Sequence, residues 1–522
     1  MREIRQHGSE GGEETSRPLS RRGRSARRGH DNLTTPPRNP SGVPALKSSM
    51  DSTAEITTDI PARIDRLPWS NFHLLVVVAL GVTWILDGLE VTIVGSIGPI
   101  LKDHRTLGLS DQDIGSIAAC YVAGAVAGAL LFGWLTDRFG RRLIFNLTLG
   151  IYMAGVLATA FAWNFWSFAC FNVITGLGIG GEYAAINSAI DELIPARLRG
   201  RIDLIVNGSY WAGAALGAAA SLLLLSGRFV GIDIGWRLGF GIGAVLSAAI
   251  LFLRRYVPES PRWQVTHGRN EEAEQTTEDI ERKVGGDLPA PKGTLKVHPR
   301  KVFGFGLILG AMLGKNRSRS FLALSLMVAQ AFLFNAVFFT YGLVLTKFYH
   351  INEARAGVYI LPLAMGNFLG PLLLGGLFDT VGRKKMIAGT YGLAGVLLIA
   401  VSVLFGMGVL TAWTQTFCWM AIFFVASAAA SSAYLTASEI FPLETRAMAI
   451  ALFYALGTLI GGVSAPFLFG YLIGTGSEWV VAAGYAGAAV LMIGAAACEA
   501  VLGVEAAGKS LEDVSAPLSS GG

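Results

Sequence analysis

Long apolar stretches recur from residue 72 almost to the end of the chain, and short polar connections separate them. Each stretch is long enough to cross a hydrocarbon layer of about 30 Å as a helix. The pattern predicts twelve membrane-spanning helices, at residues 72–99, 114–136, 142–162, 165–189, 204–226, 235–256, 321–346, 356–378, 384–406, 411–437, 447–473 and 479–503. The predicted fold class is therefore an all-α membrane protein.

One long polar break, at residues 257–319, divides the predicted helices into two sets of six. We therefore expect a first half at residues 69–256, a cytoplasmic loop at residues 257–319 and a second half at residues 320–503. Polar tails flank them at residues 1–68 and 504–522. The apolar run at residues 302–313 is too short to span and is expected at the membrane interface.

The first tail is rich in Arg, Gly, Ser and Pro and has no apolar run of the kind found in signal peptides. Such a composition predicts disorder. Residues 1–49 are either part of this tail or a stretch that precedes the true start at Met50. The Arg cluster at residues 21–28 is expected to be solvated, with contact to anionic lipid as the alternative.

Composition indicates that lipid is the solvent, because 52% of the residues are hydrophobic and 15% are charged. The net charge of +5 arises in residues 1–49, where ten Lys and Arg stand against five Asp and Glu. The remaining chain is balanced at 32 of each sign, which argues against a nucleic-acid-binding surface. The four cysteines show no metal-ligand or disulfide spacing, and neither a metal nor a cofactor is expected.

The placement of basic residues predicts the orientation, because cytoplasmic loops carry an excess of Lys and Arg. With the N-terminus inside, the short inner loops hold more basic residues than the outer loops. Both termini are therefore expected to be cytoplasmic, in a plasma membrane or in the inner membrane of a cell with two. The basic residues of the short inner loops are Arg138, Arg141, Arg142, Arg197, Arg199, Arg201, Arg383, Lys384, Lys385 and Arg446.

Two sequence patterns occur once in each half, at offsets of 242 and 247 residues. The first is Gly133-x-x-x-Asp137-Arg138-x-Gly140-Arg141-Arg142, matched by Gly375-x-x-x-Asp379-x-x-Gly382-Arg383-Lys384. The second is Glu192-x-x-Pro195-x-x-x-Arg199-Gly200, matched by Glu439-x-x-Pro442-x-x-x-Arg446-Ala447. Two six-helix halves of like topology are the parallel-repeat design of transporters whose site lies between the halves.

The first pattern resembles the major facilitator signature. The second pattern, with Pro258-Glu259-Ser260-Pro261-Arg262, resembles the sugar porter family, and the resemblance covers about residues 72–503. It implies the twelve-helix major facilitator fold and a cytoplasmic gate of switchable ion pairs that is closed in the outward-open state. The alternative is that these charges only fix loop topology. The expected gating residues are Asp137, Arg138, Arg141, Arg142, Glu192, Arg199, Glu259, Arg262, Asp379, Arg383, Glu439 and Arg446.

Ionisable groups inside a membrane are costly and mark cavities or proton paths. Asp87 and Glu90 stand three residues apart and share one face of the first predicted helix. An acid in this helix is linked to proton movement in sugar porters and in aromatic acid:proton symporters, which Asp87-Gly88-Leu89-Glu90 resembles. Proton coupling is therefore expected here, and a buried acid that supports helix packing is the alternative.

The fourth predicted helix carries a third interior acid, Glu182, after a run of glycines that begins at Gly176. The glycines let helix backbones approach closely. The Gly-Gly-Glu run resembles metabolite:proton symporters, which carry organic acids and zwitterions. Asn172 departs from the pattern, because many proton-coupled relatives have an Arg at this place, so diffusion without protons stays open.

Amide and aromatic side chains in the predicted helices are candidate contacts for a polar solute. Gln330 and Asn335 are similar to part of the sugar-binding run of sugar porters, but five residues do not place them on one face of a regular helix. Each amide has an alternative role in hydrogen bonding between helices. The candidates are Asn187, Asn207, Tyr210, Trp211, Gln330, Asn335 and Asn367.

Together these patterns predict a secondary transporter that moves a small polar or anionic solute, a sugar or an organic acid, by alternating access with proton symport. An enzyme is not expected, because the seven histidines form no catalytic or metal-binding pattern. A nucleotide-driven pump would need a phosphate-binding loop, which the sequence lacks. A facilitator, a drug or metabolite exporter and a non-transporting sensor stay open. The expected partners are the solute, protons and membrane lipid, with a monomer as the functional unit.

Overall fold

The structure of the protein is a computed structural model. It describes residues 55–224, 231–291, 293–298, 306, 310, 312–314, 316–338, 340–351 and 353–518. The predicted disorder of residues 1–54 and most of the predicted interfacial run at residues 302–313 lie outside the described residues.

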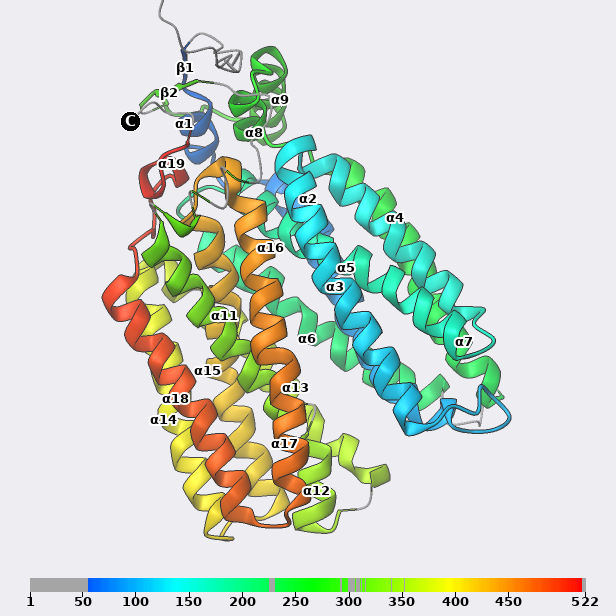
Figure 1. The fold of residues 1–522 in the computed structure, drawn as a ribbon. Coiled ribbons are helices and arrows are strands. Elements are labelled where there is room, and N and C mark those ends of the chain that lie inside the picture. Colours follow the sequence, from blue (N-terminus) through cyan, green and yellow to red (C-terminus); the bar gives the residue numbers. More distant parts are fainter. Residues whose placement is uncertain are drawn as a thin grey trace, which may run out of the picture. The chain divides into compact units, whose positions relative to one another are not determined.

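The twelve predicted helices are all present, arranged as two sets of six (Figure 1). The first half consists of α2 (Asn71–Leu101), α3 (Asp111–Phe139), α4 (Arg141–Ala160), α5 (Phe165–Leu193), α6 (Arg199–Leu224) and α7 (Ile232–Leu253). The second half consists of α11 (Arg317–Phe338) with α12 (Tyr341–Tyr349), α13 (Glu353–Thr380), α14 (Arg383–Gly406), α15 (Ala412–Glu439), α16 (Arg446–Gly457) with α17 (Ser464–Gly474), and α18 (Glu478–Leu502).

Two predicted helices of the second half are not regular throughout. The predicted helix at residues 321–346 is divided into α11 and α12 near Thr340, whose hydroxyl donates to the carbonyl of Ala336. The predicted helix at residues 447–473 continues from α16 to α17 through a π-helical turn at Thr458–Val463. Such turns are frequent at functional sites, and this one lies beside Asn335.

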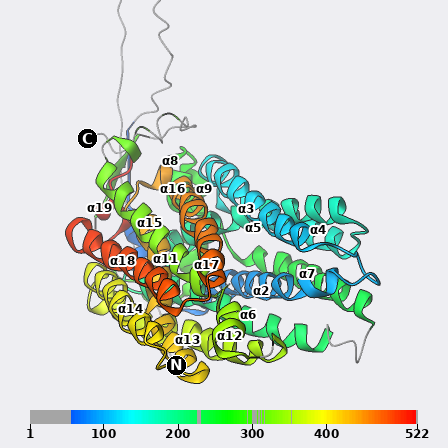
Figure 2. The same ribbon diagram turned by 60° about the horizontal axis from the view of Figure 1, so that its bottom comes forward.

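Helix α6 differs from the other membrane helices in its charge. Within the described residues, eleven spans are long and apolar enough to cross a membrane, and α6 is not among them. Its first turns contain Arg199, Arg201 and Asp203. The helix packs along α2 and against α13 of the other half, and Figure 2 shows α6 near α13. Its charged end lies at the interface between the halves, because the start of α6 bonds to Asp379 of α13.

Glycines bring neighbouring helices into backbone contact. A Cβ atom at Gly176 or Gly180 of α5 would collide with the carbonyl oxygens of Tyr121 or Ala125 in α3. The predicted packing role of this glycine run is therefore confirmed. A left-handed glycine, Gly140 (φ 98°), joins α3 to α4, and Gly382 (φ 114°) joins α13 to α14 at the corresponding place.

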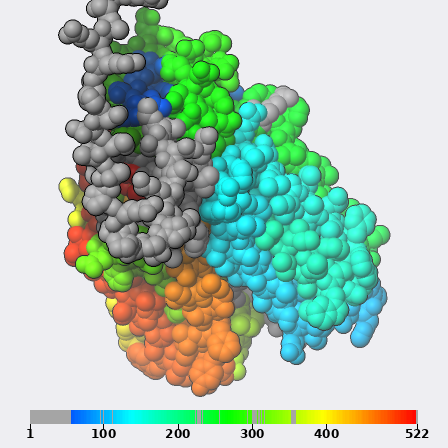
Figure 3. All heavy atoms as spheres, turned by 45° about the horizontal axis from the view of Figure 1, so that its top comes forward, coloured from blue at the N-terminus to red at the C-terminus, as the bar shows by residue number. Residues whose placement is uncertain are grey.

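Short elements cover one end of the two bundles, which we call the gate end. They are β1 (Ile56–Thr58), α1 (Ile60–Asp65), α8 (Pro261–Thr266), α9 (Asn270–Val284), β2 (Leu295–Val297) and α19 (Leu511–Val514). Strands β1 and β2 pair antiparallel, with Ile56 opposite Val297. Helix α1 packs on α9, and Figure 3 shows this blue and green surface.

Residues 55–68 differ from the predicted disordered tail. Ile60 and Ile64 of α1 are buried, and the Arg63 guanidinium lies 2.6 Å from the carboxylate of Glu281 in α9. A six-residue helix contributes too little periodicity to be found in the sequence, and it is ordered by these contacts rather than by its own propensity.

Candidate functional site

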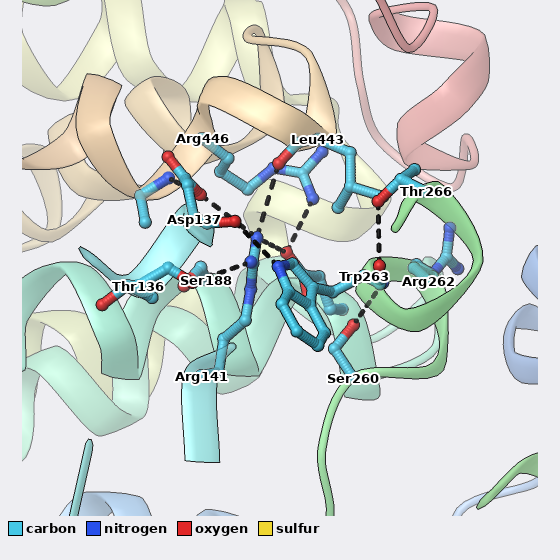
Figure 4. A network of polar contacts seen from close by, with 12 residues as sticks. Thr136, Asp137, Arg141, Ser188, Ser260, Arg262, Trp263, Thr266, Leu443 and Arg446 are labelled. Atoms are coloured by element: carbon cyan, nitrogen blue, oxygen red, sulfur yellow. Dashed lines mark hydrogen bonds and ion pairs between the residues drawn. The ribbon is translucent and has the colours of Figure 1, made fainter. Parts of the chain in front are cut away.

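At the gate end, an acid from each half caps a helix of the other half. Asp137, near the end of α3, accepts hydrogen bonds from the backbone N–H groups of Ala447 and Met448 at 3.2 and 2.9 Å. These N–H groups open α16, where the helix dipole favours a negative charge. Figure 4 shows Asp137 between α3 and the second half.

The second half repeats this contact in the opposite direction. Asp379, near the end of α13, accepts hydrogen bonds from the backbone N–H groups of Gly200 and Arg201 at 3.1 and 2.8 Å. These two groups open α6 of the first half. The internal repeat of the sequence therefore becomes a pair of reciprocal caps that join the halves.

Buried ion pairs surround the first cap. The Arg141 guanidinium lies 2.8 Å from Glu192 and 3.4 Å from Asp137. Arg446 of the second half lies 3.3 Å from the same Glu192 oxygen. Arg141 also donates to the carbonyl of Leu443 at 3.4 Å (Figure 4). Glu192 is thus shared by one arginine from each half.

The second cap has a matching set. The Arg383 guanidinium lies 3.0 Å from Glu439 and 2.7 Å from Asp379. Arg199 of the first half lies 3.7 Å from Glu439. The structure therefore brings together eight of the predicted gating residues in two related clusters: Asp137, Arg141, Glu192, Arg446, Asp379, Arg383, Glu439 and Arg199.

Glu259 lies at the border of the first cluster, where it caps α4. Its carboxylate accepts from the backbone N–H groups of Arg141 and Arg142 at 2.9 and 3.2 Å. Burial raises the pKa of Glu259 above its ordinary value, although these N–H groups and that of Ser260 favour the ionised form. Glu259 therefore holds the α3–α4 turn rather than bridging the halves.

Arg262, in α8, joins the terminal segments instead of the central clusters. It lies 2.9 Å from Asp65 and donates to Glu512 in α19 at 2.6 Å. Burial lowers the pKa of Arg262, but the carboxylates of Asp65 and Glu512 outweigh burial and leave it raised. The side chains of Arg138 and Arg142 are exposed, and Arg138 lies over the rings of Trp134 and Phe139. These two side chains do not join the described clusters.

The interior acids of α2 lie between helices of the first half. Asp87 is 2% exposed and accepts a hydrogen bond from the hydroxyl of Tyr183 at 2.7 Å. Its other oxygen has no hydrogen-bond partner among the described residues. Glu90 is 3% exposed and accepts from the hydroxyl of Tyr152 in α4. The two acids therefore bind different helices, although they share one face of α2.

Glu182 is paired with an arginine that sequence reasoning did not single out. Arg254, just after α7, lies 3.3 Å from Glu182 and donates to Thr83 at 3.2 Å. Asn172 is buried, and its amide donates to the carbonyl of Phe168 at 3.0 Å. Asn172, at the position where the resemblance leads one to expect an Arg, therefore makes a contact within its own helix. The guanidinium inside the first half comes from Arg254 instead. Asp87 and Glu182 line one small cavity with Trp84.

Aromatic rings from both halves meet beside Asp87. Tyr183 lies with its ring centroid 4.6 Å from Trp84 of α2 and 4.6 Å from Tyr454 of α16. Tyr434 of α15 lies 6.2 Å from Trp84. Sequence reasoning missed this cluster, because aromatic residues in membrane helices face lipid, protein or cavity without a distinguishing pattern.

The candidate solute contacts fall into two groups. Asn187 and Asn207 bond to each other at 3.0 Å across α5 and α6, and the amide of Asn367 donates to the carbonyl of Leu363. These amides are buried; the first two join α5 to α6, and Asn367 bonds back within α13. Tyr210 and Trp211, by contrast, lie between the halves.

Trp211 packs against Phe334 and Phe338 of α11, with centroids 5.7 and 5.1 Å away. Asn335 donates to the carbonyl of Ala331 at 2.7 Å, and its amide nitrogen lies near Gly462 in the π-helical turn. Gln330 has only a long contact to the sulfur of Met327, at 4.0 Å. Gln330 and Asn335 therefore make separate contacts.

Residues 75–517 match the family model described as "Sugar (and other) transporter". The niacin transporter of Acinetobacter baylyi is 27% identical, over 87% of this chain and 99% of that protein. The 4-hydroxybenzoate transporter of the same species is 23% identical, over 81% of this chain and 90% of that protein. The D-xylose transporter of Levilactobacillus brevis is 32% identical over 34% of this chain and 37% of that protein.

A solved structure of the proton:xylose symporter of the major facilitator superfamily, bound to 6-bromo-6-deoxy-D-glucose, has the same fold. The two chains superpose with a TM-score of 0.68 at 18% identity, over 85% of this chain and 98% of the other. The predicted twelve-helix major facilitator fold and the predicted class, a transporter and not an enzyme, are confirmed. The chain therefore belongs to the sugar (and other) transporter family of the major facilitator superfamily, and it is a multi-pass membrane transporter of small solutes.

Proposed function

We propose that this transporter carries a sugar or a small organic acid by alternating access, in symport with protons that bind at Asp87. One observation carries the proposal. The hydrogen bond from Tyr183 connects a buried carboxylate of the first half to rings of the second half. Protonation of Asp87 changes whether its carboxylate oxygen accepts the hydrogen bond from Tyr183. Because the Tyr183 ring contacts the second half, proton binding at Asp87 acts on the contact between the halves.

The ring cluster gives the solute site its chemistry. Trp84, Tyr183, Tyr434 and Tyr454 offer flat apolar faces and hydroxyl groups, which suit sugar rings and aromatic acids alike. The relatives are named as transporters of niacin, 4-hydroxybenzoate and D-xylose, and these are ring-shaped solutes. In our proposal Tyr210, Trp211 and Asn335 complete the site, while Asn187, Asn207 and Asn367 support the helices and Gln330 stays a weaker candidate.

Glu90 and Glu182 have supporting roles in this proposal. Glu182 is neutralised by Arg254 at 3.3 Å, whereas Asp87 is hydrogen-bonded to a tyrosine whose ring contacts the second half. Glu90 accepts its hydrogen bond from Tyr152 in α4 of the same half. Protons therefore act first at Asp87.

The gate clusters supply the second part of alternating access. Their caps and ion pairs hold the halves together at the gate end, and we assign this end to the cytoplasm because the basic inner loops lie there. The conformation is then closed inside. We further propose a monomer in the plasma membrane, with both termini cytoplasmic and lipid around the two bundles.

The test is uptake of radiolabelled solutes into proteoliposomes that hold the purified protein. The panel contains D-xylose, D-glucose, nicotinate and 4-hydroxybenzoate, each with an inward proton gradient and with the gradient collapsed. The proposal requires that one solute accumulate only with the gradient. Uptake that ignores the gradient would identify a facilitator, and no uptake of any solute would favour an exporter or a sensor.

A further inference from the structure

Two carboxyl groups at the gate end have no place in the coupling site or in the ion pairs. Asp191 precedes Glu192 near the end of α5, and Asp203 lies one turn beyond Arg199 in α6. Both side chains are 0% exposed. None of their four oxygens accepts a well-formed hydrogen bond from a described residue; the side chains of Ser438 and Asn207 make only weaker contacts to Asp191 and Asp203, respectively.

The two polar side chains that contact these acids weakly, Ser438 and Asn207, make their well-formed hydrogen bonds to other groups. The hydroxyl of Ser438 donates to the carbonyl of Leu435 at 2.7 Å. The amide of Asn207 donates to the backbone carbonyl of Asp203 at 2.9 Å and to Asn187. A buried carboxylate that receives no hydrogen bond is costly in its ionised form.

Charged groups face the two acids from four helices, and each arginine already has another partner. Asp191 interacts electrostatically with Arg199 of α6, Glu439 of α15 and Arg446 of α16. Asp203 interacts with Asp191, Glu439 and Arg383 of α14. Arg446 pairs with Glu192, Arg383 pairs with Glu439 and Asp379, and Arg199 lies 3.5 Å from Asp65.

The closed gate therefore contains more acids than bases. Among the described residues of the two clusters, six carboxyl groups face four guanidinium groups. The acids are Asp137, Asp191, Glu192, Asp203, Asp379 and Glu439, and the bases are Arg141, Arg199, Arg383 and Arg446. Two bound protons bring this set to neutrality.

We propose that Asp191 and Asp203 form a proton-binding site that is occupied while the gate is closed and emptied when it opens. Opening separates Glu192 from Arg446 and Glu439 from Arg199, and water then enters. Each carboxyl O–H bond breaks, its proton moves to water on the gate side, and the freed arginines stabilise the carboxylates. The inference rests on the proposed gating role of these pairs, but not on Asp87 or on the identity of the solute.

The sign of the pH dependence follows from proton release. Protons bind the closed state more tightly, so low pH favours the closed gate and rising pH favours the open gate. Linkage gives a change of up to about tenfold in the open-to-closed ratio per pH unit for each proton released. The response is lost when the acids are replaced by neutral groups of the same shape.

The experiment measures the distance between two spin labels by pulsed electron resonance in nanodiscs without solute. The labels are attached at Leu143→Cys and Lys385→Cys, two exposed positions near the starts of α4 and α14, after replacement of the four native cysteines. In the labelled protein with both acids intact, the distance between the two labels is expected to shift from short to long as pH rises. Asp191→Asn with Asp203→Asn is expected to stay short throughout, because each Asn resembles a protonated Asp.

A control variant tests whether the pH response belongs to Asp191 and Asp203 rather than to other acids. Asp287→Asn, at an exposed acid outside both clusters, should retain the pH response. A double variant that still responds, or a wild type that does not respond, would overturn the proposal. Infrared spectra provide a readout that is independent of the labels: the protonated carboxyl C=O intensity at neutral pH must be lower in the double variant than in the wild type, and an unchanged intensity contradicts the assignment. A lack of solute transport would leave all these readings unaffected.

Discussion

Glu192 of the first half and Arg446 of the second half form an ion pair of 3.3 Å, and both side chains are fully buried. Arg141 of the first half binds the same carboxylate. In the proposed gate, a carboxylate held by one arginine from each half stabilises the closed state only while the halves are together. Breaking the pair exposes both partners to water, which makes the contact reversible.

Replacing Glu192 by Ala should open the gate. The change leaves Arg141 and Arg446 buried without their shared carboxylate, at a cost of about 3–5 kcal/mol to the closed state. The measurement is the rate at which a membrane-impermeant maleimide modifies a thiol placed at position 448 by Met448→Cys, in a background without native cysteines. The rate should rise strongly, whereas Glu272→Ala, at an exposed acid of α9, should leave it unchanged. An unaltered rate in the Glu192 variant would contradict the gate.

The reciprocal caps should contribute equally. Asp137→Ala and Asp379→Ala each remove two hydrogen bonds from helix N–H groups, and each should destabilise the closed state by about 0.5–2 kcal/mol. The same maleimide assay measures both. A large effect in one variant with none in the other would show that the repeat is not symmetric in energy.

The docking of α1 should weaken in acid. The hydrogen bond from Arg63 lowers the pKa of Glu281, with a further contribution from Arg66, although partial burial opposes them. This stabilisation is present above the ordinary pKa of a glutamate and is lost as pH falls through the lowered value. The protection of the amides of residues 60–65 against hydrogen exchange, relative to the intrinsic rate at the same pH, should therefore fall in acid and, at neutral pH, in Glu281→Gln. Glu271→Gln, on the same helix, serves as the control. Equal exchange in both variants would argue against the ion pair.

Tyr183 should couple proton binding at Asp87 to the accumulation of solute. Tyr183→Phe keeps the ring beside Trp84 and Tyr454 but removes the donor to Asp87. We expect gradient-driven accumulation to fall while exchange of solute without a gradient continues. Tyr152→Phe, which removes the donor to Glu90, should have the smaller effect. The reverse order would move the primary proton site to Glu90.

The sequence was sufficient to predict the helices and the charged residues that meet at the gate end, for one physical reason. Membrane helices need long apolar runs, and charges at their ends stand out against that background. The recurrence of both motifs at similar offsets, 242 and 247 residues, also predicted that the halves repeat. Reciprocal capping by backbone N–H groups was not predictable, because it depends on how α3 meets α16 and how α13 meets α6.

Residues whose role depends on three-dimensional neighbours were missed. Arg254 occurs next to Arg255 at a helix end and looks like an ordinary flanking charge, but it reaches Glu182 inside the protein. Asp191 stands beside Glu192, so the sequence does not distinguish the unpaired acid from the paired one. Tyr434 and Tyr454 lie in apolar runs without any local sign that they face the other half.

The most direct test of proton-coupled alternating access is simultaneous measurement of solute uptake and proton entry in proteoliposomes, for the wild type and for Asp87→Asn. Our account predicts that the wild type takes up protons with the solute, and that Asp87→Asn exchanges solute without proton entry and without accumulation against a gradient. Proton entry and accumulation that persist in Asp87→Asn would contradict it.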